Sequence, residues 1–401
     1  MSSQRYYSKG SCNELRVRCD RQELFASRTA YPSRMAFGPF AVLAVVVLIG
    51  ASLRAEETDK LTVKLGQQST VYPDGYCGIH FFPDEPISVL TTRPFRFLVV
   101  NGDSTFLMQG TSLTTAVAVK KVLEPGPKNS FDNGYAGILA TVRSKQLGEY
   151  LCFYHAEDHI GMAEKLEGGT GFYASIALAV SKDGYSYAKV GQIITCSVPK
   201  GDFTTACAGV GDVSVCVDDS NKYLYAYFTD FSGVPKKKGC RISMARSLLA
   251  EGGRPGSWYK WSHNSFQEPG LKGEATPVVR GPTSFPCDAW APYVTYLTSI
   301  KKYVMVFSVA AYEDWFKPTA SRSGTYIAYS DDGIRWSEPQ VVLITHCVLF
   351  QGKEVIEHPR LYLEKETEHY AKGWCSFTHI ALALGRSQRG CHTTWCEDRS
   401  P

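Results

Sequence analysis

A pair of strand-like runs joined by a turn recurs along this chain, and the recurrence limits the folds that it can adopt. Each copy opens with an acidic or polar residue, continues through an apolar run and a turn, and ends in an aromatic-rich run. The copies open at Asp132, Asp212, Asp288 and Glu357–His358, about 70 to 80 residues apart. A repeat of this kind is typical of folds that place one supersecondary unit beside the next.

Two further segments predict a second hairpin in each unit. Ser181-Lys-Asp183-Gly184 and Ser330-Asp-Asp332-Gly333 each separate two strand-like runs. Asp-Gly between strands favours a type I′ turn, in which both central residues have positive φ. The predicted unit is therefore a four-stranded antiparallel sheet.

Four-stranded sheets repeated around an axis form a β-propeller. Upstream of the four copies, further strand candidates lie at Phe95–Val100, Thr105–Gln109 and Ala116–Val122. We therefore predict an all-β fold, a five-bladed β-propeller with four-stranded antiparallel blades, in which the last blade is completed by strands from the N-terminus. A β-sandwich with long insertions is the structural alternative.

The positive charge lies at the N-terminus. The chain has a net charge of +4, and residues 1–34 contain seven Lys and Arg against three Asp and Glu, so the remaining residues balance. A neutral body argues against a nucleic-acid partner, which needs a clustered cationic face.

The run from Phe37 to Leu53 contains seventeen residues without a charge. Its length fits the apolar part of a signal peptide or a short membrane anchor. We predict a basic leader at 1–34 and a signal peptide or signal anchor at 35–55. This N-terminal segment precedes a propeller at 56–401. A start at Met35 and a buried core helix are the alternatives. The propeller is expected outside the cytosol, secreted or membrane-anchored, with membrane contact only through the N-terminal segment.

Thirteen cysteines are present, eleven of them after the apolar run. An oxidising compartment makes disulfides an expectation, although an odd number leaves at least one thiol without an intramolecular partner. The spacing of Cys391 and Cys396 favours a C-terminal staple over a metal site.

In an antiparallel hairpin the start of strand one and the end of strand two lie at the same end. If strand one is innermost, Asp132, Asp212, Asp288 and Glu357–His358 surround one mouth of the central channel. The rim then holds four further polar residues, namely His155, Glu157, His159 and Asp230. A ring of carboxylates is what glycoside cleavage needs, because one acid protonates the leaving oxygen while another activates water or attacks carbon. Crowding also raises the pKa of the acid.

The same acidic residues and histidines also have purely structural interpretations. An Asp at the start of a strand often binds backbone N–H groups, and the two Asp-Gly segments follow outer strands and are interpreted as structural. His155, Glu157 and His159 have i, i+2, i+4 spacing, which faces one way on a strand but lacks the helical geometry of zinc proteases. We therefore predict no metal site there.

Three segments resemble five-bladed propeller glycoside hydrolases, those of family 43 and its family 32 relatives. They are Gly211-Asp212-Val-Ser-Val, Ala291-Pro292-Tyr-Val and Tyr329-Ser-Asp-Asp-Gly-Ile-Arg-Trp336. The resemblance covers residues 130–340 and implies Asp132 as the base and Asp212 as the residue that tunes the acid. The family's acidic Glu is replaced by Trp290, which leaves Asp288 and Glu274 as candidates for the acid.

The resemblance extends to His358, which is similar to a channel histidine that contacts calcium or its waters in several members. Calcium in the channel is therefore a candidate, and no other cofactor is required.

Two functions stay open. One is a glycosidase acting on a furanoside or plant-type polysaccharide, and the other is a catalytically inert propeller that binds carbohydrate or protein at the same mouth. Catalysis is assigned to Asp132, Asp212, Asp288 and Glu274, and substrate binding to His155, Glu157, Asp230, Trp290 and His358. Trp258, Trp290 and Trp315 suit sugar stacking or the filling of cores between blades. We favour the enzyme.

Overall fold

The computed structural model describes residues 86–344 apart from 163–170, 204, 206, 237, 299 and 312–321, together with a turn at Tyr76–Gly78. Six further segments, all strands, are described by their backbone only: 16–18, 62–64, 69–70, 355–366, 370–380 and 394–395. The predicted membrane segment, the Cys391–Cys396 staple and Trp315 lie outside the described residues.

The predicted all-β class is confirmed. The helical segments among the described residues are 3-10 turns of three residues each, and the remaining elements are strands. No helix in that part of the chain is long and apolar enough to cross a membrane.

Four antiparallel meanders follow one another between residues 88 and 344. The first meander consists of β4 (Ser88–Thr92), β5 (Phe95–Asn101), β6 (Ser104–Gly110) and β7 (Val117–Leu123). The second consists of β8 (Tyr135–Ser144), β9 (Glu149–Asp158), β10 (Phe172–Ser181) and β11 (Ala188–Ile194). The third consists of β12 (Cys207–Val217), β13 (Tyr223–Asp230), β14 (Arg241–Leu248), β15 (Tyr259–Ser262) and β16 (Ser265–Pro269). The fourth consists of β17 (Cys287–Leu297), β18 (Lys302–Ala311), β19 (Gly324–Ser330) and β20 (Gln340–Ile344).

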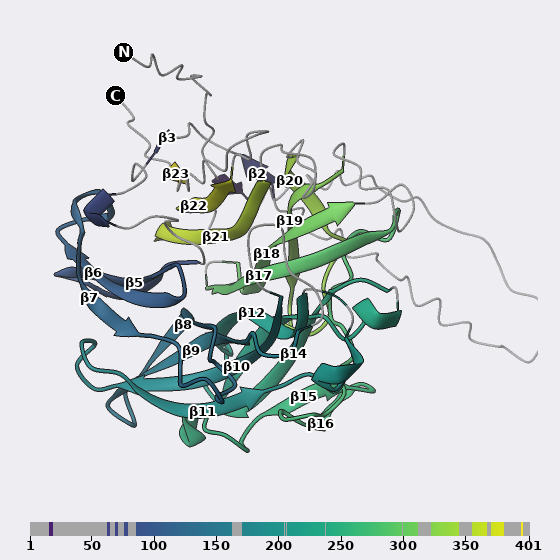
Figure 1. Ribbon diagram of the computed structural model, residues 1–401. Coiled ribbons are helices and arrows are strands. Elements are labelled where there is room, and N and C mark those ends of the chain that lie inside the picture. Colours follow the sequence, from purple (N-terminus) through teal and green to yellow (C-terminus); the bar gives the residue numbers. More distant parts are fainter. Residues whose placement is uncertain are drawn as a thin grey trace, which may run out of the picture.

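Both ends of the chain contribute to one more sheet, here called the terminal sheet. Its strand order is β21-β22-β1-β2, where the strands are β21 (Val355–Glu366), β22 (Tyr370–Ile380), β1 (Arg16–Arg18) and β2 (Thr62–Lys64). All its pairings are antiparallel, and β1 comes from the segment predicted as a basic leader. A short pair joins β3 (Ser69–Thr70) to β23 (Thr394–Trp395). In Figure 1 the first strands β8, β12, β17 and β21 lie nearest the centre, and the last strands lie at the periphery.

The first strands carry bulges that set the register of the repeat. Pairing is interrupted between Gly211 and Ser214 in β12, and between Trp290 and Tyr293 in β17. The same interruption occurs after Glu357 in β21. The first unpaired residues of β12 and β17 are Asp212 and Ala291, and both have left-handed backbone, with φ of 47° and 50°.

This register corrects the alignment of the repeat that the sequence predicted. The positions equivalent to Asp212 are Ala291 and His358, so Asp288 lies three residues before its expected place. Asp132 precedes β8 altogether. Acidic residues at similar spacings suggested one register, whereas the bulges fix another.

The Asp-Gly turns also differ from the prediction. Only the glycines, Gly184 and Gly333, have positive φ, at 75° and 74°, so the turns are not type I′. The Asp183 carboxylate instead accepts the N–H groups of Tyr185 and Ser186, at 2.7 and 2.8 Å. Asp332 repeats this arrangement at the second turn. A side chain that satisfies the turn's donors removes the need for positive φ at the aspartate.

Six cysteines in the described part of the chain carry free thiols: Cys77, Cys152, Cys196, Cys216, Cys240 and Cys287. The expected disulfides are therefore not found among these residues. Burial raises the pKa of Cys216 to about 12, which keeps that thiol protonated.

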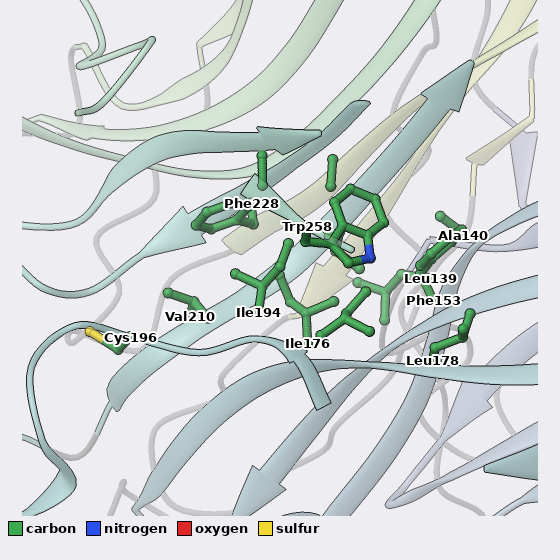
Figure 2. Close-up of a cluster of buried hydrophobic side chains, with 14 of the residues drawn as sticks. Leu139, Ala140, Phe153, Ile176, Leu178, Ile194, Cys196, Val210, Phe228 and Trp258 are labelled. Atoms are coloured by element: carbon green, nitrogen blue, oxygen red, sulfur yellow. The ribbon is translucent and has the colours of Figure 1, made fainter. Parts of the chain in front are cut away.

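The largest core among the described residues lies between the second and third meanders and is built around Trp258 (Figure 2). The indole is 1% exposed, donates from Nε1 to the Gly253 carbonyl at 2.8 Å, and packs edge to face on Phe153. Ile176 and Phe228 contribute to the same cluster from the two meanders. Trp258 therefore fills a core and is not exposed for sugar stacking.

We expect Trp258→Ala to lower the free energy of unfolding by about 3–5 kcal/mol, because it removes an aromatic side chain from a site that cannot collapse. Urea denaturation followed by circular dichroism measures the loss. Val341→Ala, at a residue that is 52% exposed on β20, is the control and should change stability by less than about 0.5 kcal/mol. Equal losses in the two variants would contradict the assignment of this core.

Candidate functional site

Three ionisable side chains lie in a row at the end of β9, where His155 and Glu157 belong to the strand and His159 directly follows it. His155, Glu157 and His159 alternate with residues that face the other way, as the strand period requires. Glu157 lies between the imidazoles, with Oε1 3.5 Å from Nε2 of His155 and Oε2 2.6 Å from Nε2 of His159. Gly134 makes room for the row, because a Cβ there would overlap the His159 ring. The predicted common face of these residues is therefore found.

His155 connects this row to Asp212 on the third meander. The Asp212 backbone N–H donates to His155 Nδ1 at 3.3 Å, and the Asp212 carboxylate oxygen Oδ1 lies 3.3 Å from the same nitrogen. The imidazole is buried edge to face against Tyr135 and Phe172. A Cβ at Gly211 would lie 2.6 Å from the ring, so glycine is needed for this approach.

Thr229 extends the chain of contacts to the fourth meander. Its hydroxyl donates to Asp212 Oδ2 at 2.7 Å and accepts the Ala291 N–H at 2.9 Å. A continuous polar array therefore runs from Ala291 through Thr229, Asp212, His155 and Glu157 to His159. Of the predicted site residues, it brings together Asp212, His155 and Glu157.

Asp132, predicted as the base, lies elsewhere. Its carboxylate is buried, pairs with the Lys189 ammonium group from β11, and accepts the Tyr154 hydroxyl at 3.2 Å. Burial and the nearby Asp132 carboxylate raise the pKa of Tyr154, which keeps the phenol a donor. Tyr154 and His155 are neighbours in β9 and so face opposite sides of the sheet, which separates Asp132 from Asp212.

The other two predicted catalytic carboxylates also have separate surroundings. Asp288 accepts the Cys240 N–H at 2.7 Å and lies 3.8 Å from Nη1 of Arg241. Glu274 is exposed beside β16, where its N–H donates to the Glu268 carboxylate at 3.4 Å. In the sheet order β16 is four strands away from β12, which carries Asp212.

Among the predicted binding residues, Asp230 is buried and accepts the Ser243 hydroxyl and the Ser232 N–H, each at 2.9 Å. Trp290 is half-buried at the last paired residue before the bulge of β17. His358 stands at the bulge of β21, and its side chain lies outside the described residues. No group of three His, Cys, Asp or Glu in the described part of the chain is arranged to hold a metal.

Beside Asp158, at the exit of β9, several polar groups converge. Burial alone would raise the pKa of Asp158, but hydrogen bonds from Lys200, Asn133 and the Ile160 N–H outweigh it and lower the pKa below its ordinary range. Asn133 also accepts the His159 N–H at 3.1 Å, which fixes the end of the row.

Lys260 is a buried lysine that the sequence did not single out. Its ammonium group donates to the carbonyls of Thr195 and Gly273, each at 2.6 Å. Burial lowers the pKa of Lys260 to about 8, against the opposing effects of Asp230, Cys196 and Glu268. Nothing in the sequence pattern distinguishes this lysine from an exposed one.

No protein-family model matches this sequence, and no curated protein does. An α-L-arabinofuranosidase from Lactobacillus brevis superposes with a TM-score of 0.50 at 12% identity, over 79% of this chain and 91% of the enzyme. An exo-1,5-α-L-arabinanase from a bovine ruminal metagenomic library aligns at 12% identity over 79% of this chain and 92% of the enzyme, with a TM-score of 0.45. For an endo-arabinase from Bacteroides thetaiotaomicron VPI-5482 the identity is 12%, the coverage 83% and 98%, and the TM-score 0.45.

The arabinofuranosidase likeness confirms the resemblance of fold to glycoside hydrolases that the three sequence segments predicted. At this identity the likeness concerns the fold alone.

We expect Lys189→Met to lower the free energy of unfolding by about 1–3 kcal/mol, because it leaves the Asp132 carboxylate buried without its cation. The matched control is Lys302→Met, which breaks an ion pair of 2.6 Å with an Asp331 side chain that is 82% exposed. That exposed pair should contribute no more than about 1 kcal/mol. Urea denaturation of the two variants tests the difference, and equal losses would contradict a structural role for the Asp132–Lys189 pair.

Lys260 predicts a pH dependence of stability. Its folded pKa of about 8 lies below the ordinary value of 10.5, so between these pH values the unfolded state binds a proton that the folded state has lost. The free energy of unfolding, compared with Lys260→Met, should therefore rise as pH increases from 8 to 10.5, by up to about 3 kcal/mol. Lys260→Met also loses the hydrogen bonds to the two carbonyls, and this loss changes its free energy of unfolding by the same amount at every pH. Denaturation midpoints at pH 7 and pH 10 measure the effect, and a constant difference would contradict it.

Proposed function

We propose that the chain is a glycoside hydrolase-like five-bladed β-propeller that binds a carbohydrate where Asp212, His155, Glu157 and His159 meet. The four meanders supply four blades, and the terminal sheet supplies the fifth. The observation that carries the proposal is the polar array on the first two strands of neighbouring meanders.

The chemistry of the array suits a sugar. Carboxylates and imidazoles exchange hydrogen bonds with hydroxyl groups, and aromatic rings pack against the apolar faces of a sugar ring. The side chains of Glu157 and His159 are 13% and 29% exposed, so both reach solvent. Phe172 stands between His155 and Phe231 and contributes aromatic surface. The arabinofuranosidase-like fold supports a glycan as the ligand class, and an arabinose-containing polysaccharide is the first to try.

Binding is favoured over hydrolysis by the surroundings of the predicted catalytic carboxylates. Hydrolysis needs two carboxyl groups on either side of one glycosidic bond. Asp132 is paired with Lys189, Asp288 holds the backbone at Cys240, and Glu274 lies beside the outermost strand. Hydrolysis is the second candidate, because Asp212 and Glu157 lie on opposite sides of the His155 ring. As an expectation from the N-terminal segment, we further propose that the propeller acts outside the cytosol.

The test uses the full chain with arabinan, 4-nitrophenyl α-L-arabinofuranoside and a panel of aryl pyranosides, measuring both binding by calorimetry and released sugar. We expect the wild type to bind arabinan and Asp212→Asn to weaken binding tenfold or more, since hydrogen bonds to charged groups contribute about 1.5–3 kcal/mol. Asn keeps an acceptor for the Thr229 hydroxyl, so the fold should survive.

Asp331→Asn, at the exposed aspartate of the Lys302 pair, is the control and should bind like the wild type. Sugar release that Asp212→Asn abolishes would favour hydrolysis over binding alone. An absence of binding across the panel would contradict the proposed function.

A further inference from the structure

A hydrogen bond at the bulge links the second meander to the third and the third to the fourth. In the third and fourth meanders, Ala291 donates its N–H to the Thr229 hydroxyl. In the second and third, Asp212 donates its N–H to His155 Nδ1. Because Asp212 and Ala291 occupy the same bulge position with nearly the same φ, His155 and Thr229 perform the same structural task.

A hydroxyl group is sufficient for that task. Thr229 is paired with Gly211, the residue before the bulge of β12, and Ser308 is paired with the equivalent Trp290 of β17. In the terminal sheet, Thr378 is paired with Glu357 in the same way. Serine or threonine therefore occupies this register in three sheets, whereas the second meander has a histidine.

The second ring nitrogen of His155 gives it a capacity that threonine lacks. Nδ1 meets both the N–H and the carboxylate of Asp212, and Nε2 on the other side of the ring faces Glu157. Glu157 in turn contacts His159, whose side chain is 29% exposed against 5% for His155. The imidazole thus connects the buried Asp212 to the two side chains that reach solvent.

We infer that His155 is a positioning residue of the carbohydrate site, holding Asp212 and Glu157 in one array so that a single ligand meets both. This inference rests on the proposed function. A hydroxyl group, that of Thr229, is enough to link the third and fourth meanders. The inference therefore assigns to His155 a second role, in ligand recognition.

The test compares His155→Asn and His155→Gln in the full chain. Asn places an acceptor near the Nδ1 position and keeps the link to Asp212, but it cannot reach Glu157. Gln extends to the Nε2 position and restores that contact. We expect His155→Asn to melt within a few degrees of the wild type, to weaken arabinan binding at least tenfold, and to shift the imidazole ¹⁵N signals of His159. His155→Gln, which restores the contact with Glu157 but not the acceptor for the Asp212 N–H, should recover the His159 signals and melt below His155→Asn.

Arabinan affinity and His159 signals that stay at wild-type values in His155→Asn would overturn the inference. If His155→Asn fails to fold, His155→Thr takes its place with the same readouts, because threonine serves the next meander. If the wild type binds no sugar of the panel, the proposed function fails. The ¹⁵N signals of His159 in the sugar-free proteins then test the inference separately: a shift in His155→Asn supports the positioning role of His155, and unchanged signals overturn it.

Discussion

A β-bulge leaves a backbone N–H that its own ladder cannot satisfy, and in this protein the preceding meander supplies the acceptor. A buried donor without a partner would cost about 1–3 kcal/mol, so the bulges at Asp212 and Ala291 each need a polar side chain from the preceding meander. This hydrogen bond helps to hold the left-handed backbone at Asp212 and Ala291. The candidate site is built on such a joint: the acceptor is a histidine, the bulge residue is an aspartate, and glycine at position 211 lets them meet.

The acidic residues divide into two groups according to whether a nearby group of the fold already binds their carboxylates. Asp132, Asp230 and Asp288 each bind a local partner, namely the Lys189 ammonium group, a serine hydroxyl and a backbone N–H. Asp212 and Glu157 share one imidazole between them and therefore form the only such array that we assign to a ligand. A fold shared with a glycosidase is compatible with either use of these carboxylates, so the function rests on the site rather than on the fold.

Much of the fold could be predicted from the sequence, because strand-like runs and turns are local signals. The runs ending at His155, Asp230 and Ser308 lie within β9, β13 and β18, and the common face of His155, Glu157 and His159 follows from the strand period. Bulge positions could not be predicted, since one extra residue changes the register without a mark in the composition. The Asp132–Lys189 pair joins residues 57 positions apart across the second meander, which no local pattern encodes. For the same reason, Lys260 resembled an ordinary surface lysine.

The most direct measurement is a crystal structure of the full chain with an arabino-oligosaccharide bound. We predict sugar oxygens within hydrogen-bond distance of Glu157 and His159, with the Asp132–Lys189 pair intact on the other side of β9. A sugar bound only on the outer strands, or one that displaces Lys189 from Asp132, would contradict the assignment of the site.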